Sequence, residues 1–211
     1  MKASASRQDE VVLEIMLDLM RTLEPPAPAS KIWEGLLQHL GKSNLALHYL
    51  SERWSFASQL LVIWSSVLPE GSSDELIRPV LWIRWPNYER LLQLQIPLHW
   101  KAIATEQLLT DTSQKPDEST FARLSATSVQ PIEQVLTLLI KTPGWWDTAT
   151  GLIILLANHR FAFSKGYNPL IKQHFQQLLD DPQQWSSALQ LRNALTHNAV
   201  YRKDVVLYML L

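Results

Sequence analysis

The sequence predicts an all-α protein, a multi-helix bundle, from two observations. Apolar residues recur at steps of three and four along most of the 211-residue chain, which is the period of one face of an α-helix. Strand-like alternation is nearly absent, and Val205–Met209 is the one stretch that could pass for a strand. The chain is long enough to bury a core of its own.

The first helices are expected at residues 7–23 and 30–40. The earlier one is amphipathic, carries acidic residues near its start as the helix dipole favours, and ends at the proline-rich residues 25–28. Ser30 is the expected cap of the later one, which ends at Gly41.

Residues 44–68 contain the longest uninterrupted helical pattern. Their apolar positions alternate steps of four and three, which predicts a seam that packs against another helix, within the chain or across a dimer. The seam consists of Leu50, Trp54, Ala57, Leu61, Trp64 and Leu68.

Basic and aromatic residues are interleaved between residues 78 and 101, where Pro79 and Pro86 should bend or break the helices. Two interpretations remain open. The mixture could form an RNA-facing surface with stacking rings. Alternatively, the rings pack inside and the basic side chains extend over their faces. The residues are Arg78, Trp82, Arg84, Trp85, Tyr88, Arg90, Trp100 and Lys101.

The clearest linker is residues 110–120, which contain no apolar side chain. We therefore expect two helical regions, at residues 1–109 and 117–211. In the second, a helix at 131–141 should have Pro131 in its first position. Residues 145–163 are apolar almost all round and predict a central buried helix. An amphipathic helix follows Pro169, and a last long helix begins at Asp181-Pro182.

Composition and missing motifs exclude several classes of function. The chain has no cysteine, so it cannot form disulfides, cysteine-ligated metal sites or thiol nucleophiles. A formal net charge of −1 gives no general attraction for nucleic acid, which would need a local basic patch. The sequence has no glycine-rich phosphate loop and no paired histidines for a metal, so we expect no cofactor and no metal. No apolar stretch is long enough for a membrane span, which favours a cytoplasmic protein.

Arg192, Asn193 and His197 form the one constellation that could carry chemistry. Five residues on a helix turn through 140° beyond one full turn, so Arg192 and His197 do not share a face of an unbroken helix. Convergence requires a helix end or kink between them, or partner groups from a second copy. The other five histidines occur singly and are interpreted as structural or solvent-facing.

The run Arg192-Asn193-Ala194-Leu195-Thr196-His197 resembles the motif of the HEPN superfamily, all-α domains with arginine and histidine four to six residues apart late in the domain. The resemblance covers residues 117–211 and implies metal-independent endoribonuclease activity at a homodimer interface. It implies that His197 is the general base, that Arg192 clamps the scissile phosphate, and that Asn193 supports them. Neutral imidazole suits this role at physiological pH.

The expected substrate is single-stranded RNA, and the expected setting is phage defence, a CRISPR system or a toxin with an antitoxin partner. One branch of the family has a tyrosine two residues after the histidine, whereas this chain has Ala199, so regulation through that tyrosine is not expected. Two alternatives stay open. The chain could be a non-catalytic helical subunit or RNA- or protein-binding scaffold of a larger ribonucleoprotein complex. Arg192 could instead pair with Asp180 or Asp181, and His197 could cap a helix.

Overall fold

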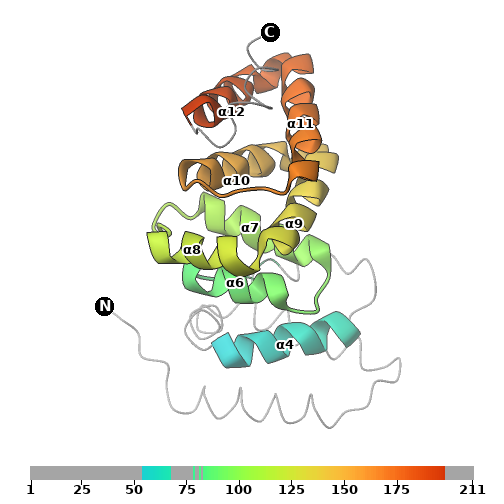
Figure 1. Ribbon diagram of the computed structural model, residues 1–211. Coiled ribbons are helices and arrows are strands. Elements are labelled where there is room, and N and C mark those ends of the chain that lie inside the picture. Colours follow the sequence, from blue (N-terminus) through green and yellow to red (C-terminus); the bar gives the residue numbers. More distant parts are fainter. Residues whose placement is uncertain (1–53, 68–77, 79–80, 82, 198–211) are drawn as a thin grey trace. The chain divides into compact units, whose positions relative to one another are not determined.

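The computed structural model describes residues 54–67, 78, 81 and 83–197 of the chain. All regular structure in these residues is helical, which confirms the predicted all-α class (Figure 1). The helices predicted at residues 7–23 and 30–40, and the strand candidate at Val205–Met209, lie outside the described residues.

The chain divides into two compact units, one of residues 1–84 and 94–104 and the other of residues 85–93 and 105–211. The predicted division between residues 109 and 117 falls inside the second unit. In the first unit the structure describes α4 (Trp54–Val67) and the start of α7 (Leu98–Thr110). Of the predicted seam on α4, Leu61 is buried and Trp54 is half-buried.

Helix α6 (Trp85–Gln93) overturns the expectation that Pro86 breaks a helix. Pro86 is the second residue of α6, where the amide that proline lacks would have no helical partner. Trp85 and Tyr88 on α6 and Trp100 on α7 are all buried. These three rings therefore do not form an exposed stacking surface for RNA, and the interpretation of a packed aromatic core is the better one here.

Helix α8 (Glu118–Thr127) begins inside the predicted linker, which shortens the irregular segment to residues 111–117. Its start is fixed by Asp117, whose carboxylate accepts the backbone N–H of Thr120 at 2.8 Å. Helix α8 packs against α6. Gln93 of α6 donates to the carbonyl oxygen of Thr127 at 2.9 Å, and Glu89 accepts the Thr127 hydroxyl at 2.8 Å.

Helix α9 (Val129–Lys141) begins two residues before the predicted start, so Pro131 lies inside the first turn rather than at its first position. Proline is tolerated there because the first amides of a helix have no helical acceptor. The buried positions of α9 follow the three-and-four spacing that predicted it. They are Ile132, Val135, Leu136, Leu139 and Ile140.

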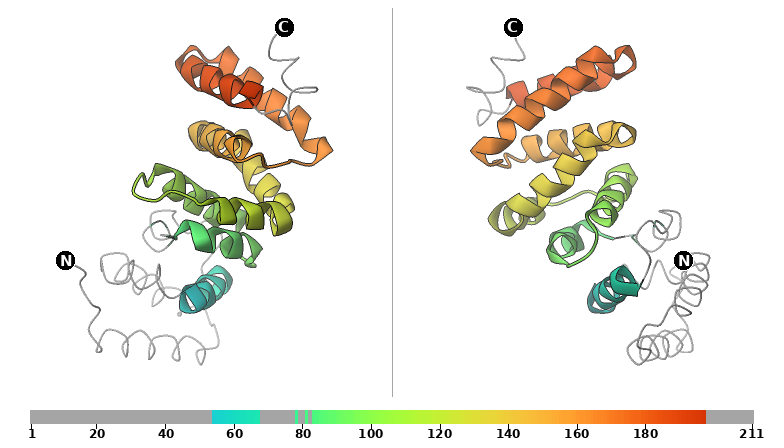
Figure 2. Two further views of the ribbon diagram at one scale, coloured as in Figure 1. Left: turned by 60° about the vertical axis from the view of Figure 1, so that its left-hand side comes forward. Right: turned by 90° about the vertical axis from the view of Figure 1, so that its right-hand side faces the viewer.

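Helix α10 (Trp146–Asn158) follows the short 3-10 helix η2 (Pro143–Trp145) and packs against both α9 and α12 (Figure 2). The prediction of a buried helix is confirmed for its face formed by Ala149, Leu152, Ile153 and Leu156. It is wrong in extent, because α10 ends at Asn158 rather than Phe163.

The end of α10 is a tight backbone turn. The N–H of Phe161 donates to the carbonyl of Leu156 at 2.9 Å, and the N–H of Arg160 donates to that of Ala157 at 3.0 Å. This pair of bonds is the Schellman motif, which places one residue in the left-handed region and usually has glycine there. Here that residue is Arg160, with φ of 57°. Without a glycine, the pattern gave no signal that the helix stops.

The connection from α10 to α11 (Asn168–Asp180) is bonded to α9. The backbone N–H of Ser164 donates to the Glu133 carboxylate at 2.6 Å. The Tyr167 hydroxyl, in the 3-10 helix η3 (Lys165–Tyr167), bonds the carbonyl of Glu133 and lies 2.9 Å from the Thr137 hydroxyl. Helix α11 then places His174 in the core, which confirms the structural interpretation for this histidine.

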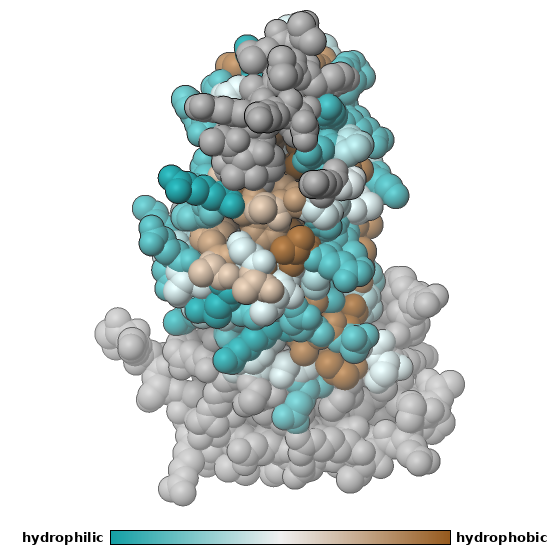
Figure 3. All heavy atoms as spheres, viewed as in Figure 1, coloured by the Kyte–Doolittle hydropathy of each residue, from teal (hydrophilic) through white to brown (hydrophobic). Residues whose placement is uncertain are grey.

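None of the described helices combines the length and the apolarity that a bilayer span needs. In the view of Figure 3, apolar side chains gather in the middle of the described surface, with polar side chains around them. Large apolar side chains that stay exposed include Leu179, Trp185 and Leu189, at 42%, 60% and 54%.

Candidate functional site

Helix α12 (Trp185–His197) positions the predicted motif. Asp181 accepts the backbone N–H of Gln183 at 3.0 Å and starts the 3-10 helix η4 (Pro182–Gln184), from which α12 continues. The last helix thus begins close to where Asp181-Pro182 predicted it. Its buried residues are Ala188, Leu191 and Leu195, and it packs against α10 and α11.

The helix is unbroken from Arg192 to His197. The two residues are therefore 140° apart around the axis, and one copy of α12 does not bring them onto one face. Asn193 and His197 are exposed and Arg192 is half-buried. Since no kink lies between them, convergence of Arg192 and His197 requires a second copy.

Exposed residues on α12 form a row at steps of four. The α12 row consists of Trp185, Leu189, Asn193 and His197. Residues four apart are neighbours on a helix surface, so two polar members of the motif continue an apolar pair. The Trp185 indole N–H donates to the carbonyl of Leu179 at 2.9 Å, which holds this exposed ring in place.

The internal pairings considered for Arg192 are not formed in the part of the chain that the structure describes. Asp180 accepts from the Gln176 amide at 2.8 Å, Asp181 caps Gln183, and neither makes an ion pair with Arg192. His197 is the last residue of α12, where a protonated imidazole would interact favourably with the helix dipole. Capping by His197 thus stays compatible with the geometry.

No group of three or more histidine, aspartate or glutamate side chains that could hold a metal ion occurs among the described residues. The chemistry open to α12 is therefore that of its own amide, imidazole and guanidinium groups. An imidazole can exchange a proton near neutral pH, and a guanidinium can bind a phosphate through two parallel hydrogen bonds.

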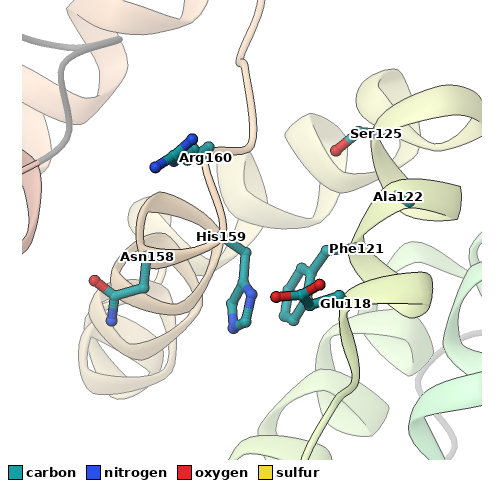
Figure 4. A pocket seen from close by; sticks show the side chains of 7 residues that line it. All are labelled: Glu118, Phe121, Ala122, Ser125, Asn158, His159 and Arg160. Carbon is teal, nitrogen blue, oxygen red and sulfur yellow. The ribbon is translucent and has the colours of Figure 1, made fainter.

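A second candidate site lies between α8 and the turn after α10, as a hollow of about 530 Å³ (Figure 4). Phe121 and Ala122 line it, together with five polar residues: Glu118, Ser125, Asn158, His159 and Arg160. The His159 ring stacks on Phe121, with ring centroids 3.7 Å apart and planes within 8°. Asn158 and Arg160 extend from the turn on the side away from α8.

The sequence did not predict this second site. His159 was grouped with the solitary histidines, because Phe121 is 38 residues away in the sequence and no local spacing links the two. The consecutive Asn158-His159-Arg160 after an apolar run was the available signal, and it was absorbed into the expected helix 145–163.

Comparisons with known protein families, with curated proteins and with solved structures find no match to this chain. The resemblance to the HEPN superfamily thus depends on the spacing and the late position of Arg192, Asn193 and His197.

Proposed function

We propose that this protein is a metal-independent endoribonuclease of the HEPN type that acts on single-stranded RNA, in phage defence or as a toxin. The observation that supports it is the placement of the motif. Asn193 and His197 lie exposed in the α12 row, and Arg192 beside them makes no ion pair within the described residues.

The proposed reaction is attack of a ribose 2′-hydroxyl on the adjacent phosphorus atom. Neutral His197 accepts the hydroxyl proton, and the 2′-oxygen forms a bond to phosphorus while the bond to the 5′-oxygen breaks. Arg192 stabilises the charge that develops on the phosphate oxygens. The partner's His197, in its protonated form, donates a proton to the 5′-oxygen. The products are a 2′,3′-cyclic phosphate and a 5′-hydroxyl.

This mechanism requires a homodimer, since one unbroken α12 directs Arg192 and His197 to different sides. Two copies related by a two-fold axis through the α12 row would bring two arginines and two histidines together. Trp185 and Leu189, at the other end of the row, would supply apolar contact area to such a dimer.

The first test is cleavage of single-stranded RNA in EDTA. His197→Ala should abolish cleavage, whereas Gln190→Ala, an exposed change on the same helix, should leave it unchanged. Equal circular dichroism spectra and unfolding temperatures would show that both variants fold. Full activity of His197→Ala would refute the assignment.

Mixing two inactive variants provides a sharper test. Arg192→Ala and His197→Ala dimers, dissociated and re-associated together, should recover about a quarter of the wild-type rate, because half of the dimers are mixed and each has one of two sites intact. Activity of each variant alone should stay near background. No recovery in dimers shown to be mixed would exclude a site shared between copies.

A non-catalytic function is the second candidate, and the exposure of Leu179, Trp185 and Leu189 favours it. In this proposal the same apolar residues dock the chain, as a helical subunit, into a larger ribonucleoprotein or defence complex, possibly with an antitoxin as partner. It predicts no cleavage by the wild type. It also predicts that Trp185→Ser with Leu189→Ser releases the bound partner or RNA while the fold is retained.

A further inference from the structure

We propose that the hollow between α8 and the turn after α10 binds a nucleotide. An unpaired base stacks on the face of His159 opposite Phe121, and the phosphate of the same nucleotide contacts Arg160. This site is separate from Arg192, Asn193 and His197 on α12 and does not depend on the proposed cleavage.

The stack of His159 on Phe121 supplies the platform. Phe121 is only 3% exposed and belongs to the core of α8, so it fixes the position of the ring that lies against it. His159 itself is exposed, and its second face is directed away from α8 (Figure 4). A planar ring bound there would extend an existing stack without any rearrangement of the rings. Bases are recognised in this way on aromatic side chains because every base has a π face.

Asn158 lies next to this face and can contact the edge of a base. Its amide carries both a donor and an acceptor, the combination that pairs with the N6 and N7 atoms of adenine. The amide makes no hydrogen bond to another described residue, so it is available to a ligand as far as the described chain shows. Adenine is therefore the preferred base.

Arg160 is the unusual residue of the turn. Its φ of 57° lies in the left-handed region, where a side chain other than glycine costs about 1–2 kcal/mol by its own conformational strain. Strain of this kind often accompanies function. In this conformation the guanidinium extends on the same side as Asn158 (Figure 4). It makes no ion pair with a described residue.

The end of α10 would itself repel a phosphate, because the negative end of the helix dipole lies there. The turn reduces this repulsion, since the carbonyls of Leu156 and Ala157 accept hydrogen bonds from the backbone N–H groups of Phe161 and Arg160. The guanidinium of Arg160 must then supply the attraction, and phosphate binding should weaken as salt rises.

The volume of about 530 Å³ fits one nucleotide. The same chemistry is presented by a free nucleoside monophosphate and by one unpaired nucleotide of a single-stranded RNA. Titration of the full chain with AMP and with a short oligoadenylate distinguishes these sources. A free-nucleotide site binds both with similar affinity, and a strand site binds the oligoadenylate at least tenfold more tightly than AMP.

Calorimetric titration with AMP, adenosine and ribose 5-phosphate tests the two halves of the ligand. AMP should bind about tenfold more tightly than ribose 5-phosphate, which lacks the base, because stacking on an aromatic ring contributes on this scale. Adenosine should bind with an affinity that hardly changes with salt, because it lacks the phosphate. Equal affinities for AMP and ribose 5-phosphate would overturn the proposal.

Three variants separate binding from stability. His159→Ala should weaken AMP about tenfold, whereas His159→Phe should restore the affinity by restoring a planar ring. Arg160→Gly should weaken AMP and remove its salt dependence while the turn is relieved of strain, so misfolding cannot account for the loss. Arg90→Ala removes an exposed arginine from α6 and is the charge-matched control, with no expected effect.

The result is independent of the proposed ribonuclease function. His197→Ala should leave AMP affinity unchanged even if it abolishes cleavage. Absence of saturable binding of both AMP and the oligoadenylate, or unchanged affinity in His159→Ala, would refute the nucleotide site and leave the motif on α12 unaffected.

Discussion

Acid should destabilise this protein well before its carboxylates are protonated, because His174 is completely buried on α11. Its Nε2 atom lies 3.0 Å from the Thr150 hydroxyl of α10, and its Nδ1 atom has no hydrogen-bond partner among the described residues. Burial lowers the pKa of His174 from 6.5 to about 4, against the opposing effects of the nearby Gln177 side chain and the charge of Asp147.

The sign follows from proton linkage. Between pH 6.5 and 4 the unfolded chain binds a proton at this histidine and the folded chain does not, so stability falls as the pH falls through this window. The two pKa values give a loss of about 3 kcal/mol between pH 7 and pH 4, with about 1.3 kcal/mol already lost at pH 5.5. Such a loss is a large part of the stability of an ordinary domain.

Urea unfolding at pH 7, 5.5 and 4 measures this loss for the wild type and for His174→Gln. The amide of glutamine does not titrate, so the variant should lose much less stability over the same range. His99→Gln, a change of a half-buried histidine, is the matched control and should follow the wild type. An equal loss in His174→Gln and the wild type would refute the assignment of the acid sensitivity to this residue.

Three further changes have expected effects on the free energy of unfolding, measured by urea titration. Arg160→Gly should raise it by about 0.5–1 kcal/mol, because glycine adopts the left-handed conformation without strain, and a decrease would contradict this account of the turn. Leu152→Ala should lower it by about 3 kcal/mol by leaving a cavity in the fully buried face of α10, and a loss below about 1 kcal/mol would show that this face is loosely packed. Tyr88→Phe should lower it by about 1 kcal/mol, since the buried hydroxyl lies 2.8 Å from that of Thr105, and an unchanged value would show that this bond contributes nothing.

The helices of the second unit could be predicted because their apolar spacing matches their buried faces. This holds for α9, where Ile132, Val135 and Leu136 are all buried. Boundaries were less predictable, because they depend on capping groups with variable chemistry. Asp117 starts α8 inside a segment without apolar residues, and Arg160 ends α10 where a glycine would have given the signal.

The candidate sites differ in how much the sequence could predict. The motif on α12 is local, so its 140° separation followed from helix geometry, and the unbroken helix agrees with that premise. The stack of His159 on Phe121 joins two helices far apart in the sequence, and no periodicity encodes such a contact. The basic and aromatic residues near Trp85 and Trp100 show the opposite case, in which composition suggested a surface and burial excluded it.

The hydrogen bond from Ser164 to Glu133 has a consequence for the timescale of local opening. The segment between α10 and α11 has little regular structure, and such segments usually exchange their amide hydrogens quickly. The amide of Ser164 can exchange only when the carboxylate of α9 releases it, and the Tyr167 hydroxyl, bonded to the carbonyl of Glu133, holds the same segment a few residues later. Exchange at Ser164 should therefore report the docking of this connection on α9, at a position where the backbone itself forms no helix.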